Sequence, residues 1–266
     1  MADNLPPSLT FSQEEVVLLL KLFNAPTIPG VGEDPLPGLD EERQRLILST
    51  AERGLKARQL VSKAEDGTVV IEKMVLALLG TCVAPEFSVI ASRIERRQPP
   101  ENIYFHCAQK MVVAHTISGP GLHTFAALTD RAQLFDHLQR FLKLTDKPAL
   151  PESGNVAATA LRDALQALES GAEAIQQHLL NGGASPAFAQ VLSQELNAAT
   201  INYTILAMQH PADGETRTRH LSLLDTAHTL WKMEGGEETA ETTVLRLKSV
   251  ATATARQELA DMILSS

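Results

Sequence analysis

Histidine and cysteine side chains gather in one short stretch of the sequence, where they could in principle bind a metal ion. His106, Cys107, His115 and His123 lie in this stretch. A structural zinc site needs three or four ligands that converge on one point. His106 and Cys107 are adjacent in a segment typical of a β-strand, so their side chains face opposite sides, and no spacing here matches a zinc ligand pattern. We therefore expect no metal site and no cofactor, and we expect Cys107 to be a core residue.

A catalytic triad is equally hard to assemble from this sequence. His228 follows Asp225 by three residues, but no Gly-x-Ser-x-Gly motif supplies a nucleophile. We interpret Asp225 as a turn or bulge residue. The glycine-containing turns at 118–121 and 182–183 lack the lysine and the spacing of a phosphate-binding loop. The sequence therefore predicts a protein that is not an enzyme.

Two groups of basic residues raise the question of nucleic-acid binding. The order helix, helix, turn, helix and strands faintly resembles a winged helix, and basic residues occur at 43–63 and again at 93–97. A DNA-binding protein concentrates positive charge along one recognition element. Here Glu42 and Glu52 interleave with the first group, which is typical of a solvated helix face. Nucleic acid is therefore not the expected partner.

The composition is that of an ordinary globular chain with excess negative charge. The 266 residues include 23 basic and 32 acidic side chains, a net charge of −9, and 44% are hydrophobic. No apolar run reaches about 18 residues, so no segment is expected to cross a bilayer. Two cysteines are too few for a disulfide framework, and the first residues do not form a secretory signal. We therefore expect a cytoplasmic protein with no membrane partner.

Hydrophobic periodicity and turn residues predict the elements of the first half. Helices are expected over 12–23, 40–62 and 69–80 and from Asp130 onward, with Ser12 and Asp40 as N-caps and Glu15 completing a capping box. Strands are expected over 87–95, 103–107, 111–117 and 123–128. The proline- and glycine-rich residues 24–39 predict a loop.

The second half shows a similar order after a proline-rich linker at 145–155. The Ala- and Leu-rich residues 156–181 predict one long helix. Ser185 followed by Pro186 predicts the start of another, because proline at the first turn leaves no donor unpaired. Strands are expected over 202–209, over 219–233 as a pair or one bent strand, and over 242–249, followed by a helix over 250–264.

A shift of 116 residues brings the two halves into register. Residues 87–91 (Phe-Ser-Val-Ile-Ala) then meet residues 203–207 (Tyr-Thr-Ile-Leu-Ala), and Gly119 meets Gly235. We interpret this as an internal duplication, with a first α/β repeat and leading helix at 1–145 and a second repeat at 146–266. Pairing two small sheets edge to edge removes two exposed edges. The sequence therefore predicts an α+β, pseudo-twofold fold in one domain, with a central antiparallel sheet flanked by two helical bundles.

Three stretches carry a resemblance to the EspG family of type VII (ESX) secretion chaperones. They are residues 9–11 before the first helix, the strand pair at 87–117 and its echo at 203–233. The resemblance lies in the organisation of nearly the whole chain. It implies a cytosolic, non-enzymatic protein that holds a helical secretion substrate through sheet loops and the C-terminal bundle. By position, it implies a partner-binding loop made of Arg96, Arg97, Gln98, Pro99 and Pro100.

The sequence as a whole predicts a protein-binding module, possibly a chaperone or adaptor for a helical substrate. The partner is expected to be a protein, and the chain a monomer or homodimer. Two alternatives stay open: a winged-helix-derived nucleic-acid-binding regulator, and a small-molecule binder or enzyme of unknown reaction. The Ala-rich helix expected at 156–181 departs from the EspG pattern.

Overall fold

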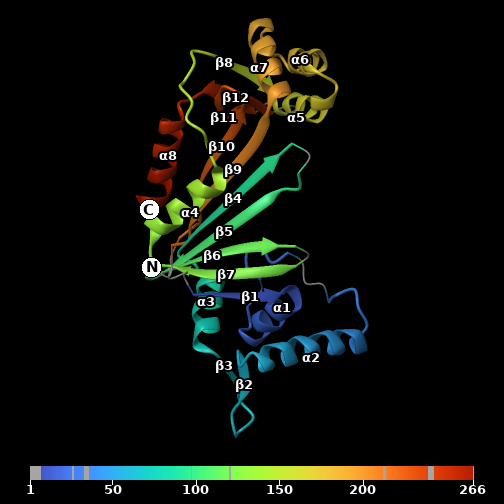
Figure 1. Cartoon of the computed structure of the whole chain (residues 1–266), viewed down its shortest axis with the longest axis vertical. Helices are drawn as coiled ribbons and strands as arrows, with labels where there is room; N and C mark the ends of the chain where they lie inside the picture. Colours follow the sequence, from blue (N-terminus) through green and yellow to red (C-terminus); the bar gives the residue numbers. More distant parts are fainter. Residues whose placement is uncertain are drawn as a thin grey trace, which may run out of the picture. The chain divides into compact units, whose positions relative to one another are not determined.

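The computed structural model divides the chain into two compact units, each built from segments far apart in the sequence (Figure 1). Unit 1 comprises Met1–Ile90, Asn102–Asp136 and Met208–Thr218, and unit 2 comprises Ala91–Glu101, His137–Ala207 and Arg219–Ser266. The structure describes residues 7–265 apart from 26, 33–35, 97, 120, 212–213 and 239–242, with only the main chain of 236–238.

The sheet of unit 1 has the strand order β1-β7-β6-β5-β4. Its strands are β1 (Ser8–Ser12), β4 (Phe87–Glu95), β5 (Glu101–Ala108), β6 (Met111–Ser118) and β7 (Leu122–Leu128). β1 pairs with β7, β7 with β6 and β6 with β5, all antiparallel. The strands predicted between 87 and 128 are thus confirmed, with ends within two residues of the expected ones.

Four helices begin in unit 1 among the described residues, and a small hairpin lies between two of them. The helices are α1 (Gln13–Leu22), α2 (Glu41–Ala57), α3 (Lys73–Val83) and α4 (Arg131–Leu142). The hairpin consists of β2 (Val61–Lys63) and β3 (Val69–Ile71). The capping box is confirmed, since Ser12 accepts from the Glu15 amide and the Glu15 carboxylate accepts from the Ser12 amide.

Two predicted helix boundaries in this part of the chain are wrong. The helix expected to reach residue 62 ends at Ala57, because Gln59 adopts a φ of 58° and the amide of Leu60 turns back to the carbonyl of Leu55. The helix expected from residue 69 begins at Lys73. Residues 69–71 (Val-Val-Ile) are β-branched and pair with β2 instead.

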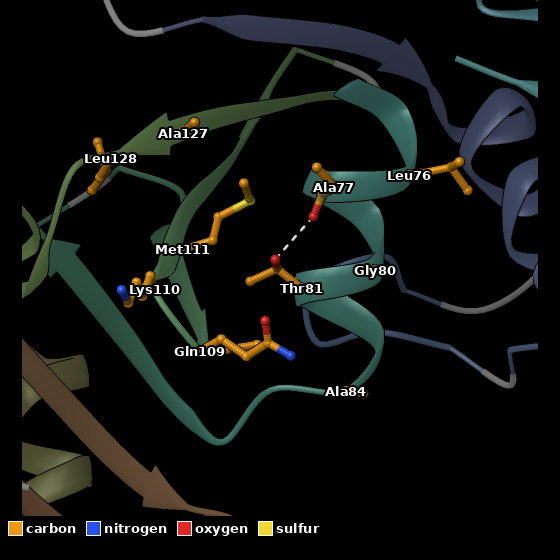
Figure 2. Close-up of a pocket in the computed structure, with 11 residues that line it drawn as sticks. Leu76, Ala77, Gly80, Thr81, Ala84, Gln109, Lys110, Met111, Ala127 and Leu128 are labelled. Atoms are coloured by element: carbon orange, nitrogen blue, oxygen red, sulfur yellow. Dashed lines mark hydrogen bonds between the residues drawn. The ribbon is translucent and has the colours of Figure 1, made fainter. Parts of the chain in front are cut away.

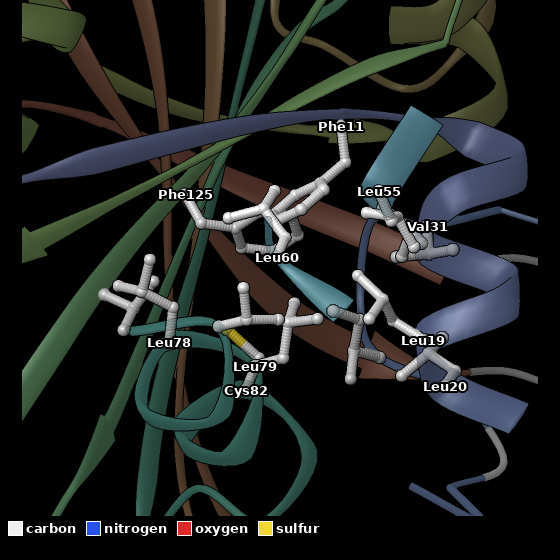
Figure 3. Packing of buried hydrophobic residues seen from close by; sticks show 14 of the residues in the cluster. Phe11, Leu19, Leu20, Val31, Leu55, Leu60, Leu78, Leu79, Cys82 and Phe125 are labelled. Carbon is white, nitrogen blue, oxygen red and sulfur yellow. The ribbon is translucent and has the colours of Figure 1, made fainter. Parts of the chain in front are cut away.

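The core of unit 1 lies between the helices and one face of the sheet (Figure 3). Phe11 of β1 and Phe125 of β7 stand with ring centroids 6.0 Å apart. Leu19 of α1, Leu55 of α2 and Leu79 of α3 pack into the same cluster and are fully buried. The apolar faces that helical periodicity predicts are therefore the faces that cover this sheet.

Unit 2 is built in a similar way, with the strand order β9-β10-β11-β12-β8. The strands are β8 (Ser153–Ala157), β9 (Thr200–Gln209), β10 (Arg217–Thr226), β11 (Leu230–Glu238) and β12 (Thr243–Ser249). The helices are α5 (Ala158–Gln166), the 3-10 helix η1 (Ala167–Glu169), α6 (Ala172–Asn181), α7 (Pro186–Ala198) and α8 (Thr252–Leu264). Ser185 caps α7 by accepting from the amide of Phe188, as predicted.

The linker expected at 145–155 lacks helix and strand only as far as residue 152, and the expected long helix is wrong. Residues 153–157 form β8, which pairs with β12. The stretch predicted as one helix at 156–181 is divided into α5, η1 and α6, and Gly171 between them has a φ of 87° that glycine adopts readily. Gly154 of β8 leaves room for the ring of Phe188 in α7, so the strand packs closely against the helices that follow it.

The fold class is α+β with a large antiparallel sheet, as the sequence predicts. The element order of a strand, helices, four sheet strands and a final helix occurs in residues 8–142 and again in 153–264. From α3 to β6 the recurrence follows the 116-residue shift to within a few residues, whereas β8 lies further from β1 than that shift allows. A common origin of the two halves, and their union as repeats 1–145 and 146–266 of one pseudo-symmetric domain, stay predictions.

Candidate functional site

The loop between β4 and β5 belongs to unit 2 and presents the residues expected to meet a partner. Gln98, Pro99 and Pro100 are exposed, and the amide of Gln98 donates to the carbonyl of Glu95 in a tight turn. Arg97 lies outside the described residues. The two prolines have fixed φ angles and no amide hydrogen. The tip of the loop is therefore stiff and accessible.

Arg96, the first residue of the predicted loop, points toward the helices. Its Nη2 donates to the carbonyl of Leu168 in η1 at 2.6 Å, and its Nη1 lies 3.5 Å from the carbonyl of Asn197 near the end of α7. Carbonyls at helix C-termini lack intrahelical donors and carry partial negative charge. Arg96 therefore anchors the loop to the helices of unit 2 and does not reach outward.

The base of the same loop is held by a second arginine. Arg93 of β4 is 9% exposed and donates to the carboxylate of Glu95 at 2.6 Å and to that of Glu101, at the start of β5, at 3.2 Å. One guanidinium thus joins both sides of the loop where the strands end. Arg93 therefore holds the two strand ends at the base of the loop, and Arg96 holds the loop against the helices of unit 2.

A pocket of about 520 Å³ opens between this loop, the α5–η1 segment and the start of β9. Its apolar wall is formed by Ile94, Leu165 and Leu168, and Ile94 is 45% exposed. Polar groups surround that wall, namely Arg96, Gln98, Arg162, Gln166, Asn202 and others. A concave apolar surface with a few polar groups around it is the usual form of a binding site.

A second pocket, of about 590 Å³, lies in unit 1 between α3, the β5–β6 turn and β7 (Figure 2). Met111 and Leu128 line it with Leu76, which is 43% exposed. The hydroxyl of Thr81 donates to the carbonyl of Ala77 at 2.9 Å, so it is already engaged within the helix. Lys110 is the one charged residue in the described lining. This composition offers apolar surface and no evident acid–base pair.

The clustered histidines are brought together, but inside the core. His106, His115 and His123 lie on β5, β6 and β7 and are at most 1% exposed. Burial lowers the pKa of His106 to about 4 and that of His115 to about 3, so both rings are neutral at pH 7. No three His, Cys, Asp or Glu side chains in the described part of the chain are placed to hold one metal ion.

Cys107 is buried, as expected for a core residue, and burial raises the pKa of its thiol to about 11. Asp225 and His228 do not meet as catalytic partners. Asp225 lies within β10, where it is 8% exposed and accepts from the ammonium of Lys147, so its interpretation as a turn residue is wrong. His228 is exposed, and its amide donates to Glu195.

Two basic residues at the end of α2 and just after it form ion pairs with nearby carboxylates. Arg58 lies 2.7 Å from the carboxylate of Glu15 and also donates to the carbonyl of Thr10, while Lys56 lies 2.6 Å from the carboxylate of Glu52. Arg45 and Arg53 donate to the carbonyl of Glu41 and the hydroxyl of Thr50 on the same helix. None of these contacts favours a recognition helix for DNA.

The chain shares its fold with a solved structure. It is similar to the solved structure of the type VII secretion system chaperone EspG5 of Mycobacterium tuberculosis in complex with a PE25–PPE41 dimer. The TM-score is 0.60 at 16% sequence identity, covering 97% of this chain and 96% of that one. At this identity the likeness shows a shared fold.

The sequence of the chain also matches a protein family. Residues 32–249 match the family described as "Uncharacterised protein YfjC", and the chain belongs to this family. No curated protein matches the sequence. Within the described residues, no helix is both long and apolar enough to cross a membrane.

Proposed function

We propose that this protein is a chaperone or adaptor that binds a helical protein substrate at the β4–β5 loop of unit 2. The observation that carries the proposal is the pocket of about 520 Å³ beside the stiff tip formed by Gln98, Pro99 and Pro100. The EspG-like fold supports it, because the solved relative is a chaperone seen with a protein dimer. Its cytoplasmic location and its state as a monomer or homodimer remain predictions of the sequence.

The pocket suits the end of a helix rather than an extended peptide. Its volume accommodates a few side chains, and its apolar wall of Ile94, Leu165 and Leu168 would cover apolar residues of the partner. The polar rim of Gln98, Arg162 and Gln166 can hydrogen-bond to the unpaired backbone groups of a helix terminus. Because Arg93 and Arg96 already hold the loop, little ordering entropy is lost on binding.

Site-specific photo-crosslinking in cells of the source organism tests the proposal. A photoreactive residue at position 98 should capture one defined protein, and the same residue at the exposed Gln190 of α7 should not. The Ile94→Arg variant places a charge on the pocket wall and should abolish capture. Leu264→Arg, an equally exposed leucine on α8 (49%), is the matched control. Equal capture from positions 98 and 190, or full capture by Ile94→Arg, would contradict the proposal.

The two alternatives have distinct signatures. A nucleic-acid-binding regulator would bind random duplex DNA at low salt, where non-specific binding is strongest. A small-molecule binder would use the pocket of unit 1. An added Cβ at Gly80 meets no atom within 4 Å, so the side chain of a Gly80→Leu variant has room to enter this pocket. That variant should therefore displace a bound ligand. No described contact at present favours either over protein binding.

A further inference from the structure

The hairpin of β2 and β3 is a separate two-stranded sheet that projects from unit 1 below α3 (Figure 1). Val69 and Val70 of β3 are 38% and 47% exposed, while Ile71 packs its side chain against the core of this unit. A two-stranded sheet is marginally stable in water, and three or more strands are normally needed. A further strand beside β3 would therefore stabilise the hairpin.

The hydrogen bonds within the hairpin determine which main-chain groups point away from it. The amide of Glu72 donates to the carbonyl of Leu60 at 2.9 Å. Opposite residues of antiparallel strands alternate between hydrogen-bonded and non-hydrogen-bonded pairs. Counted from that bonded pair along the register, Val69 and Ile71 belong to non-bonded pairs, so their N–H and C=O groups point away from β2. No other group in the described part of the chain bonds to them, and we call these groups the β3 edge.

The outermost strand of the main sheet of unit 1, by contrast, has a protected edge. At β1, the guanidinium of Arg58 donates to the carbonyl of Thr10. The carboxylate of Glu15 accepts from the amide of Ser12. The β3 edge has no such cover, because residues 69–71 are uncharged and β-branched, without a proline or a bulge. An edge of this kind is a template for pairing with another chain.

A second copy of β3 fits the β3 edge in one antiparallel register. In a twofold contact, each residue that touches a second one is touched by it in turn. The outward groups of the two copies meet when Val69 of one copy lies opposite Ile71 of the other, and all N–H and C=O groups of the β3 edge are then bonded. Val70 lies opposite Val70 of the second copy in a close non-bonded pair, and such β-branched pairs stabilise a sheet.

The charges at the two ends of β3 are complementary in the same register. Glu65 and Asp66 lie in the turn before β3, and Lys73 is the first residue of α3 after it; all three are exposed. Because the two copies run in opposite directions, the acidic turn of one lies beside Lys73 of the other. The turn also brings its carboxylates to the N-terminus of α3, where negative charge is favourable. A second copy supplies these charges by symmetry, whereas the extended segment of another protein would have to match them.

We propose that the β3 edge is a self-association site, at which two copies of this protein pair antiparallel and join their hairpins into one continuous sheet. The paired surface is small, so the dimer is weak and forms only at raised concentration. The site lies in unit 1 and is independent of the partner site proposed on unit 2.

Sedimentation equilibrium of the full chain tests the association. The apparent mass should rise from 28.8 kDa toward twice that value between micromolar and millimolar concentration. Val69→Pro removes an amide that points away from β2, so the hairpin should persist and the rise should be abolished. Lys63→Pro is the matched control, because Lys63 lies opposite Val69 and its amide points to the other edge of the hairpin. It should associate as wild type does.

A charged variant gives the same test without a change of the main chain. Val70→Lys places two ammonium groups opposite each other across the axis and should also abolish the rise in mass. A wild-type mass that stays constant up to millimolar concentration overturns the proposal. Association of Val70→Lys as strong as that of wild type does so as well.

A cysteine at position 70 tests the register. Val70 meets its counterpart at a Cα separation of about 4.5 Å, which a disulfide can span. Val70→Cys should form a disulfide-linked dimer under mild oxidation, and the two native cysteines are buried. Ser62→Cys, at the exposed residue opposite Val70 in β2, should stay unlinked. If an extended segment of another protein covers the β3 edge instead, Val70→Cys will link no better than Ser62→Cys, and the proposal is wrong.

Discussion

Lys147 and Asp225 form a buried ion pair in unit 2, although 78 residues of sequence separate them. Their side chains are 10% and 9% exposed, and the ammonium of Lys147 also donates to the carbonyl of Thr226. The pair lies between the segment that follows α4 and the end of β10. It attaches a part of the chain without regular structure to the sheet.

Removing one partner of this pair should be costly. Lys147→Met leaves the Asp225 carboxylate buried and uncompensated, which typically costs about 3 to 5 kcal/mol in the free energy of unfolding. Lys248→Met, at an exposed lysine of β12, should change it by less than about 0.5 kcal/mol. Urea denaturation of both variants at pH 7.5 measures the difference. Similar midpoints for the two variants would show that the pair contributes little.

His106 should make the protein less stable in mild acid. Its ring is 1% exposed, both ring nitrogens lack a hydrogen-bond partner in the described part of the chain, and its pKa falls from 6.5 to about 4 through burial and the charge of His210. Because the folded pKa is lower, the unfolded chain takes up the proton first as the pH falls. Above pH 6.5 His106 is neutral in both states and does not lower the free energy of unfolding. As the pH falls from 6.5 to about 4, the unfolded chain binds a proton that the folded ring does not, and the free energy of unfolding decreases.

His106→Phe should remove this dependence. We compare the free energy of unfolding of His106→Phe with that of wild type at each pH. The difference, variant minus wild type, should be about 2 kcal/mol more favourable to the variant at pH 5 than at pH 7.5. Urea denaturation at the two pH values gives this number. His228→Phe, at an exposed site, should show the wild-type dependence. If His106→Phe loses stability in acid as steeply as wild type, another group carries the effect.

Replacing each of two glycines by alanine should change the stability of the protein in opposite directions. A Cβ at Gly154 would lie 2.3 Å from the ring of Phe188, so Gly154→Ala forces β8 away from α7 and should cost about 1 to 3 kcal/mol. A Cβ at Gly80, within α3, meets nothing within 4 Å, so Gly80→Ala should add about 0.5 to 1 kcal/mol. Thermal unfolding of the two variants should shift in opposite directions, and shifts of one sign would argue against this packing.

Arg96 should affect partner binding through the position of the loop. Arg96→Ala loses the contacts to the carbonyls of Leu168 and Asn197, which are partly exposed, and should cost about 1 kcal/mol in stability. The crosslinking yield at position 98 should fall with it. Arg162→Ala removes an arginine of the same pocket whose side chain is 67% exposed, and should leave stability unchanged. An unchanged yield in Arg96→Ala would mean that the loop needs no anchor.

Local signals were enough to predict the elements whose ends are determined by neighbouring residues. The capping box of Ser12 and Glu15 and the Ser185–Pro186 start of α7 are of this kind. β8 could not be found in this way, because Ser153–Ala157 contains a glycine and small residues and becomes a strand only by pairing with β12, almost 90 residues later. The break at Gly171 was hidden by the high helix propensity on both sides of it.

The loop at 96–100 was predicted from the sequence, its role in partner binding stays a prediction, and the contacts that hold it were not predicted. The EspG resemblance implies this loop by its position, and the structure has residues 98–100 exposed between β4 and β5. The inward role of Arg96 depends on carbonyls of Leu168 and Asn197, about 70 and 100 residues away. No pattern near Arg96 indicates these partners. The same holds for Gln13 and His123, which meet across 110 residues.

The segment that follows α4 is bound firmly to the last helix. The hydroxyl of Thr252 donates to the carbonyl of Thr145 at 2.8 Å and lies 3.1 Å from the amide of Lys147. Arg256 donates to the carbonyl of Leu144 and to the carboxylate of Asp146, both at 2.7 Å. A second half expressed from residue 153 onward would therefore leave α8 with unpaired polar groups. Anyone who wishes to produce that half by itself should begin the chain before Leu144.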